Sequence, residues 1–161
     1  MTEPLIVDAT KAQLETVIRW LRKEALEEKG GFYCNRSIIR SSFRKSEMKC
    51  IVIGRVVVGF AIISLNIQNS AIDIFEIRSG YRNKGYGKKF ASYLINLLFT
   101  QGSPLIKVEC SPHASEWFWR ELGFVDREAK PSMFGNPKLE LRSLFNYSFE
   151  QGTPKAASPS I

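Results

Sequence analysis

The sequence predicts one α/β domain with a short tail. At 161 residues, with 44% hydrophobic and 12% aromatic side chains, the chain is long and apolar enough to bury one core. A β-rich run, Ile72–Ile77, leads into a basic turn that contains glycines, and apolar residues at helical spacing follow. We expect the domain to span residues 1–150. Residues 151–161 hold too few large apolar side chains to pack, so we expect a disordered tail.

The N-terminal part predicts a strand and then an amphipathic helix. Leu5–Ala9 is a short apolar run, and Thr10 with Gln13 forms a capping box that starts a helix. We expect Gly30–Gly31 to end this helix and its apolar face to pack on a sheet. The residues of that face are Leu14, Val17, Ile18, Leu21 and Ala25.

Residues 32–49 have the least regular pattern of the chain, apart from a series of arginines. Arg36, Arg40 and Arg44 recur every four residues, so in a helix they would share one face. Such a series is usually the solvated flank of a helix. It would equally suit the wall of a cleft that receives an anionic substrate, and the sequence alone leaves both interpretations open.

The central part predicts antiparallel strands. Ile51–Ile53 and Val56–Leu65 are β-branched runs joined at Gly54–Arg55, which is the pattern of a hairpin. Ser70–Ile77 is then a central strand, apolar on nearly all of both faces. After the glycine-containing turn we expect a helix, a strand, a helix capped by Gly123, and a late strand. The last three of these elements are Leu105–Cys110, Ala114–Leu122 and Leu139–Phe145.

Two carboxylates interrupt the apolar central strand. Asp73 and Glu76 are costly there unless they face a cleft or a partner. Because side chains alternate along a strand, we expect the two on opposite faces, with at most one facing a bound substrate.

The turn after this strand predicts an anion-binding loop. Arg82, Gly85 and Gly87 form an R-x-x-G-x-G pattern. Glycines let the backbone pass close to a ligand, and the following helix offers unpaired N–H groups and the positive end of its dipole. Such a turn suits phosphate. The turn does not match the loop of nucleotide hydrolases, and the first glycine of the dinucleotide fingerprint is missing.

This segment resembles the acyl-CoA-binding motif of the GCN5-related N-acetyltransferase (GNAT) superfamily, in which a strand leads into R/Q-x-x-G-x-G/A and a helix. Phe118–Phe124 is similar to a second motif of that superfamily, a helix that often ends F-Y-x-x-x-G-F. The resemblance covers roughly residues 51–125. It implies the GNAT fold, a mixed and mostly antiparallel central sheet with helices on both faces.

The resemblance also implies a site for acetyl-CoA. Loop amides would hold the pyrophosphate, and the preceding strand would pair with the pantetheine arm. The implied cofactor-binding residues are Ile77, Arg78, Arg82, Asn83, Lys84, Gly85, Tyr86, Gly87 and Lys88. Residues 32–49 correspond to a variable cover over the acceptor, which makes Arg36 and Arg40 candidate substrate residues. Trp119 joins them, because at least one aromatic residue of Trp117–Trp119 is expected to face the cofactor or acceptor.

Acetyl transfer to an amine needs a base, because a lysine-type amine has a pKa of about 10.4 and is almost wholly protonated at pH 7. Asp73 and Glu76 are the candidate catalytic residues, and Glu76 is favoured because it lies closer to the expected thioester. An ion pair with a nearby basic residue is the alternative for either. Many members place a thiolate-protonating tyrosine where this chain has Trp119, whose indole is not a useful acid. A thiolate with a pKa of about 8.5 leaves tolerably without full protonation.

Two functions fit the sequence. The first is an N-acetyltransferase, in which a primary amine attacks acetyl-CoA directly. The second is a binding module on the same fold that holds CoA or RNA without turnover, motivated by Trp119 and a net charge of +7. The series of arginines around Arg40 favours an acidic peptide, a nucleotide-linked amine or aminoacyl-tRNA as acceptor over a polyamine.

Other sequence features concern the metal content, the compartment and the partners of the protein. Cys34, Cys50 and Cys110 are odd in number and lack metal-ligand spacing, so we expect no metal and a reduced, cytoplasmic protein. The N-terminus lacks the regions of a signal peptide, and the apolar run Ile51–Leu65 is too short and too interrupted to span a bilayer. We expect no membrane partner, and a monomer or a homodimer.

Overall fold

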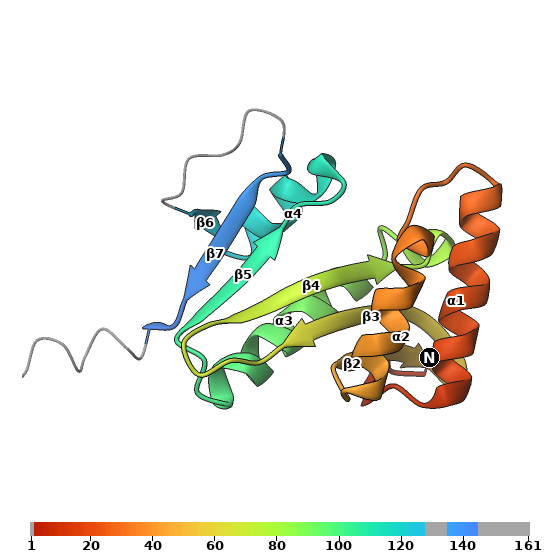
Figure 1. The fold of residues 1–161 in the computed structure, drawn as a ribbon, viewed down its shortest axis with the longest axis horizontal. Helices are drawn as coiled ribbons and strands as arrows, with labels where there is room; N and C mark the ends of the chain where they lie inside the picture. The colour runs from red at the N-terminus through yellow and green to blue at the C-terminus, as the bar shows by residue number, and fades with distance from the viewer. Residues whose placement is uncertain (1, 128–134, 145–161) are drawn as a thin grey trace, which may run out of the picture.

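The computed structural model describes residues 2–127 and 135–144, within which seven strands form one sheet (Figure 1). The strand order is β1-β2-β3-β4-β5-β7-β6, and every neighbouring pair is antiparallel except β4 with β5. The strands are β1 (Leu5–Asp8), β2 (Met48–Ile53), β3 (Val56–Ser64), β4 (Ser70–Ile77), β5 (Leu105–Glu109), β6 (Val125–Asp126) and β7 (Lys138–Arg142). This is the mixed, mostly antiparallel sheet that the sequence predicts.

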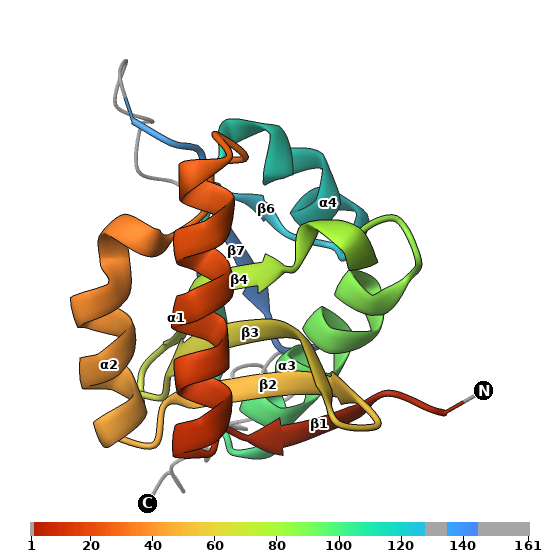
Figure 2. The same cartoon turned by 90° about the vertical axis from the view of Figure 1, so that its right-hand side faces the viewer.

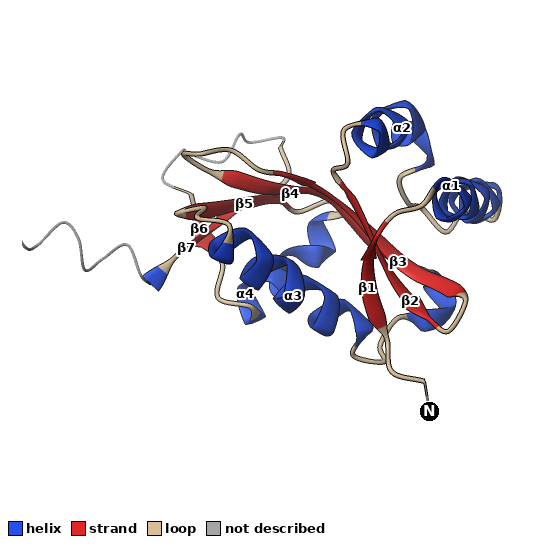
Figure 3. Ribbon diagram, turned by 90° about the horizontal axis from the view of Figure 1, so that it is seen from below, coloured by secondary structure: helices blue, strands red, loops and turns tan. Residues whose placement is uncertain are grey.

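Helices cover both faces of the sheet, as expected. The α-helices are α1 (Lys11–Leu26), α2 (Arg36–Arg44), α3 (Tyr86–Thr100) and α4 (Glu116–Glu121), and the 3-10 turns are η1 (Tyr33–Asn35), η2 (Ser79–Tyr81) and η3 (His113–Ser115). Figure 3 shows α1 and α2 on one side and α3 and α4 on the other. Each side buries a core of its own, centred on Leu21 and Phe60 under α1 and on Phe90 and Leu94 under α3.

Helix α1 begins as predicted and ends earlier than predicted. Thr10 and Gln13 form both hydrogen bonds of the capping box. The helix ends at Leu26, and Glu28 takes the left-handed conformation with φ 56°. The Lys29 N–H then donates to the Glu24 carbonyl at 2.9 Å. These bonds close the helix before Gly30–Gly31, so those glycines lie in the loop that follows instead of capping the helix.

A bulge in β4 changes which way its side chains face. Ile63 of β3 pairs with Ile72 and Ile62 pairs with Ile74, so Asp73 is an extra residue in β4. As a result Ile72 and Ile77 pack in the same core although they are an odd number of residues apart. Asp73 and Glu76 both line the cleft, as do all the residues between them, so the lining does not tell on which face each carboxylate lies. The prediction that they lie on opposite faces assumed unbroken alternation, which the bulge at Asp73 interrupts, and it stays a prediction.

Strands β4 and β5 pair over a short length and then separate. Their parallel register joins Ser70–Ile72 with Ile106–Val108. Beyond Ile72 the strands diverge, as Figure 1 shows, and among the described residues no strand pairs with the rest of β4 on that side. In Figure 2, α1 and α2 lie side by side over the β2–β4 part of the sheet. The separation of β4 and β5 is the opening that forms the cleft.

The remaining elements largely follow the sequence. The hairpin and β4 occur where predicted, with β2 beginning three residues earlier at Met48. Gly123 takes the left-handed conformation with φ 96° after the last helix. The short β6 was not expected, the late strand ends at Arg142, and Phe145 and the tail 151–161 lie outside the described residues. Within the described ranges, every helix is too short or too polar to cross a bilayer.

Candidate active site

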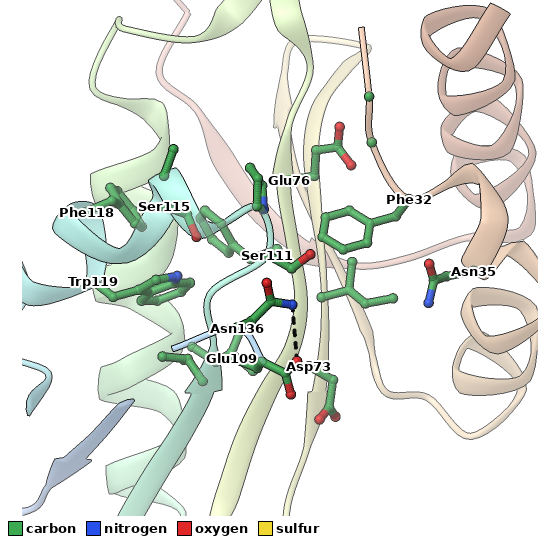
Figure 4. Close-up of a pocket in the computed structure, with 18 of the residues that line it drawn as sticks. Phe32, Asn35, Asp73, Glu76, Glu109, Ser111, Ser115, Phe118, Trp119 and Asn136 are labelled. Atoms are coloured by element: carbon green, nitrogen blue, oxygen red, sulfur yellow. Dashed lines mark hydrogen bonds between the residues drawn. The ribbon is translucent and has the colours of Figure 1, made fainter. Parts of the chain in front are cut away.

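A cleft of about 1150 Å³ lies where β4 and β5 separate. Its walls come from β4, from the loop after α1 with Gly31 and Phe32, and from the segment that carries Ser111 and Trp119. Figure 4 shows Phe32 reaching toward β4 from one side and Phe118 and Trp119 lying on the other. This volume lies slightly above the range of about 300–1,000 Å³ that is usual for small-molecule sites.

One end of the cleft adjoins the glycine loop. Gly85 is the N-cap of α3 with φ 82°, and no side chain caps this helix. A Cβ built on Gly85 would meet no atom within 4 Å, so the space in front of the loop is open. Uncapped N–H groups at a helix start with open space before them fit a pyrophosphate. The exposed Lys88 adds positive charge in the first turn of α3.

The arginine of the motif turns inward, away from this open space. The Arg82 Nε donates to the Ile77 carbonyl at 2.8 Å, and its Nη2 donates to Glu76 Oε1 at 3.3 Å. Nη2 also lies 3.9 Å from Glu24 Oε2 of α1. Its side chain therefore joins the loop to the end of β4 and to α1.

The backbone at the end of β4 faces the cleft. The Arg78 N–H donates to the Val58 carbonyl of β3 at 2.9 Å. Because successive N–H groups of a strand point to opposite sides, the Ile77 N–H points toward the side that β5 has left. This gives the cleft a fixed hydrogen-bond donor beside Glu76.

Glu76 is buried and has one oxygen without a hydrogen bond. Its exposed fraction is 6%, and Oε2 has no partner among the described residues. The pKa of Glu76 is raised to about 7, chiefly by burial and next by the Glu24 carboxylate, while Arg82 and the Phe32 N–H oppose the rise. A Cβ on Gly31, where φ is +104°, would stand 3.0 Å from Glu76 Oε1. Glycine at position 31 is what lets this loop close over the carboxylate.

A second pair of carboxylates lies further along the cleft. Asp73 is exposed, and Glu109 lies beyond the last residue of β5 that pairs with β4. Figure 4 shows both at the end of the cleft away from Phe118, and Asn136 Nδ2 donates to Glu109 Oε1 at 3.3 Å. This end is more open and more polar than the surroundings of Glu76.

Trp119 belongs to an aromatic cluster on the cleft wall. Its exposed fraction is 4%, and it lines the cleft. Its ring lies 5.3 Å from Phe75 and 5.3 Å from Phe124, both edge to face, and Phe118 stacks on Phe75 at 5.7 Å. The structure thus places Trp119 at the site while using most of its surface for packing.

The arginine series of α2 does not line the cleft. Arg40 forms a two-bond ion pair with Glu15 of α1, at 2.6 and 3.1 Å. The Arg36 guanidinium lies 4.8 Å from the centre of the Tyr33 ring. Neither is among the residues that line the cleft. Arg36 does line a smaller pocket that shares Gly31 and Cys34 with the cleft, so its substrate role stays a prediction, whereas the ion pair accounts for Arg40 without a substrate.

The structure brings together site residues that sequence reasoning missed. Phe32, Glu109 and Asn136 come from segments far apart in the chain, and no local pattern marks them. Glu24 is different, because it follows Val17 by seven residues and Leu21 by three, which places it on the apolar face of α1. A charged residue on the apolar face of a helix is a sequence signal that could have identified Glu24. Within the described ranges, no group of three or more His, Cys, Asp or Glu side chains is arranged for a metal ion.

Solved structures with the same fold include several acetyltransferases. PH1933 from Pyrococcus horikoshii OT3 is 19% identical, with a TM-score of 0.69 over 88% of this chain and 99% of its own. A PaiA N-acetyltransferase from Thermoplasma acidophilum in complex with coenzyme A is 14% identical, with a TM-score of 0.67 over 88% and 99%. N-acetylglutamate synthase from Neisseria gonorrhoeae, complexed with coenzyme A and N-acetyl-glutamate, is 13% identical, with a TM-score of 0.72 over 88% and 35%. A search of curated proteins finds no match.

The separated strands, the glycine loop at the start of α3 and the carboxylate-lined cleft define the fold of acyltransferases that use acyl-CoA. The family model described as the acetyltransferase (GNAT) family matches residues 14–124. The chain belongs to this family. Family membership supports acetyl transfer from acetyl-CoA in general and leaves the acceptor unassigned.

Proposed function

We propose that the protein is an N-acetyltransferase that moves the acetyl group of acetyl-CoA to a primary amine. When bound, acetyl-CoA supplies a thioester carbonyl that the amine attacks directly, so that an N–C bond forms and the C–S bond breaks. The observation that carries the proposal is Glu76, a buried carboxyl with a pKa of about 7 and an unpartnered oxygen in the cleft beside the glycine loop. Such a group accepts a proton at neutral pH.

The residues of the chain take separate roles in this proposal. The loop from Arg82 to Lys88 holds the pyrophosphate through its backbone amides, while the Arg82 side chain keeps the loop attached to β4. The Ile77 N–H donates to the carbonyl oxygen as negative charge develops on it. Glu76 takes the proton that the attacking amine loses. Trp119 shapes the wall of the cleft and donates no proton, so the thiolate leaves without a dedicated acid.

The acceptor proposed here is an amine that approaches as a cation. Asp73 and Glu109 lie along the cleft, whereas Arg36 and Arg40, on which the expectation of an acidic acceptor rested, do not line it. Asp73 and Glu109 would attract the ammonium form, whereas Lys107 and Arg127, which also line the cleft, would attract a negatively charged part of the same acceptor. Asp73 thereby serves as a substrate-facing group, with Glu76 as the base.

Release of the CoA thiol, measured with a thiol reagent against a panel of amines, tests the proposal. We expect release that depends on both acetyl-CoA and an amine and that is lost in Glu76→Gln. Binding of acetyl-CoA without release for any amine in the panel would contradict transfer and favour a non-catalytic CoA-binding module. Mass analysis of the acetylated amine identifies the product.

A further inference from the structure

Two buried carboxylates share one arginine at the inner end of the cleft. Glu24 of α1 has an exposed fraction of 5% and Glu76 of β4 one of 6%. The Arg82 Nη2 lies 3.9 Å from Glu24 Oε2 and 3.3 Å from Glu76 Oε1. Glu24 Oε2 and Glu76 Oε2 each lack a hydrogen-bond partner. One guanidinium cannot neutralise two ionised carboxylates, so the two buried side chains compete for Arg82, whose own side chain is 44% exposed.

The groups around this cluster are few. From α1 only Glu24 acts on Glu76 among the described residues, and from the loop after η2 only Arg82 does so. The β3 neighbour paired with Glu76 is Phe60, which is apolar, and the loop over the carboxylate presents the backbone of Gly31 and Phe32. Lys29 lines the same cleft, pairs with Glu27 at 2.6 Å and also interacts electrostatically with Glu24, so it is a second cation near the cluster.

The two carboxylates are not equivalent in position. Glu24 Oε1 accepts the Ser79 N–H at 3.0 Å, so this side chain fixes the start of η2. Glu24 does not line the cleft, whereas Glu76 does. A proton bound by the cluster can therefore exchange with a ligand in the cleft at Glu76, while Glu24 contributes its charge from behind.

We propose that Glu24 is a positioning residue for acetyl transfer: its charge, sharing Arg82 with Glu76, keeps Glu76 able to accept a proton at neutral pH. The inference rests on the proposed function of Glu76 as the base. Without Glu24, Arg82 would be left wholly to Glu76, and only burial would still raise the pKa of Glu76, so Glu76 would bind a proton less tightly. Glu24 thus acts on the reaction without touching either substrate.

Titration of Glu76 by NMR, with ¹³C-labelled glutamate carboxyls and the Glu76 signal assigned from Glu76→Gln, tests this without turnover. In Glu24→Gln the midpoint should fall by about one pH unit, because a neighbouring negative charge is gone. In Arg82→Gln it should rise, because a positive charge is gone. If the substitutions instead loosened the site, the Glu76 midpoint would move toward the ordinary carboxyl value in both variants. Opposite movements therefore separate a charge effect from a structural one.

Glu15→Gln is the matched control, because it removes the same charge from the same helix at a position that pairs with Arg40. It should leave the Glu76 midpoint unchanged. An unchanged or raised midpoint in Glu24→Gln overturns the proposal. If that variant does not fold, a midpoint in Arg82→Gln that falls or stays the same overturns it instead.

Activity gives a second readout that distinguishes the two proposals. In Glu24→Gln the acid limb of the kcat/KM profile should move to lower pH together with the NMR midpoint. If the NMR midpoints move as expected but the protein transfers no acetyl group, the proposed function is contradicted. The electrostatic effect of Glu24 on Glu76 would still stand. Transfer with an unmoved limb would remove the role of Glu24 alone.

Discussion

The two ends of the cleft are built in different ways. The cofactor end is a stretch of backbone, in which Gly85 with φ 82° and the uncapped start of α3 make the binding surface. The acceptor end is made of side chains from distant segments, among them Phe32, Glu76 and Asn136. A backbone site depends on a short local sequence and tolerates little change in it. A side-chain site depends on the tertiary fold and can be changed one residue at a time.

A large effect on CoA binding should come from a change at the backbone end. Gly85→Glu should reduce CoA binding by more than about 100-fold, because a carboxylate would fill the open space before the amides and repel a pyrophosphate. Calorimetric titration with CoA measures this. The matched control is Gly102→Glu, since Gly102 also has a left-handed φ, of 90°, and open space around it. Both variants bear the same backbone strain, so CoA binding by Gly85→Glu like that of Gly102→Glu would contradict the loop assignment.

At the side-chain end, the two carboxylates of β4 should differ strongly. Glu76→Gln should lower kcat by about 10²- to 10⁴-fold with CoA affinity nearly intact, which is the usual loss when a general base is removed. Asp73→Asn should mainly raise the KM for a cationic amine, because Asp73 is exposed and lies away from the loop. Steady-state kinetics separate the two. A large fall in kcat in Asp73→Asn with little change in Glu76→Gln would transfer the role of base to Asp73.

The free energy of unfolding should also report the buried environment of Glu76, and this measurement needs no substrate. A carboxyl whose pKa is raised from 4.5 to about 7 binds its proton more tightly when folded. The stability that this contributes is fully present below pH 4.5 and is lost as pH rises through about 7. Glu76→Gln removes the loss and should be more stable than the parent by up to about 3 kcal/mol at pH 8, with little difference at pH 4. Urea unfolding at pH 4 and pH 8 measures the difference in the free energy of unfolding between Glu76→Gln and the parent. An equal difference at the two pH values would contradict a raised pKa of Glu76.

The smallest effect should come from the arginine series of α2. Arg40→Gln should lower the free energy of unfolding by less than about 1 kcal/mol, because its ion pair with Glu15 is largely solvated. The KM for the amine should not change. Glu15→Gln should lower the free energy of unfolding by about the same amount. A KM that rises several-fold in Arg40→Gln alone, and only for an acidic acceptor, would restore the sequence-based expectation.

The sequence predicts the local backbone features better than it predicts the side-chain contacts between distant segments. The loop at Gly85, the bounds of β4 and the capping box at Thr10 are set by short-range geometry, and the structure has them where expected. The alternation that the sequence predicts along β4 is interrupted at Asp73, because a bulge depends on how β3 pairs with β4 and leaves no local mark. The lining by Phe32 and Asn136 was missed for the same reason. Glu24 could have been found, since it is a charge on an apolar helix face.

The pH dependence of kcat/KM in the parent protein tests the central claim most directly. Two acceptor amines of different pKa should be compared, so that ionisation of the amine and of the protein can be told apart. We predict an acid limb with a midpoint of about 7 that is the same for both amines, because Glu76 must be deprotonated to accept a proton. The limb should disappear in Glu76→Gln. An acid limb that follows the amine and shows no common midpoint near 7 would contradict the account.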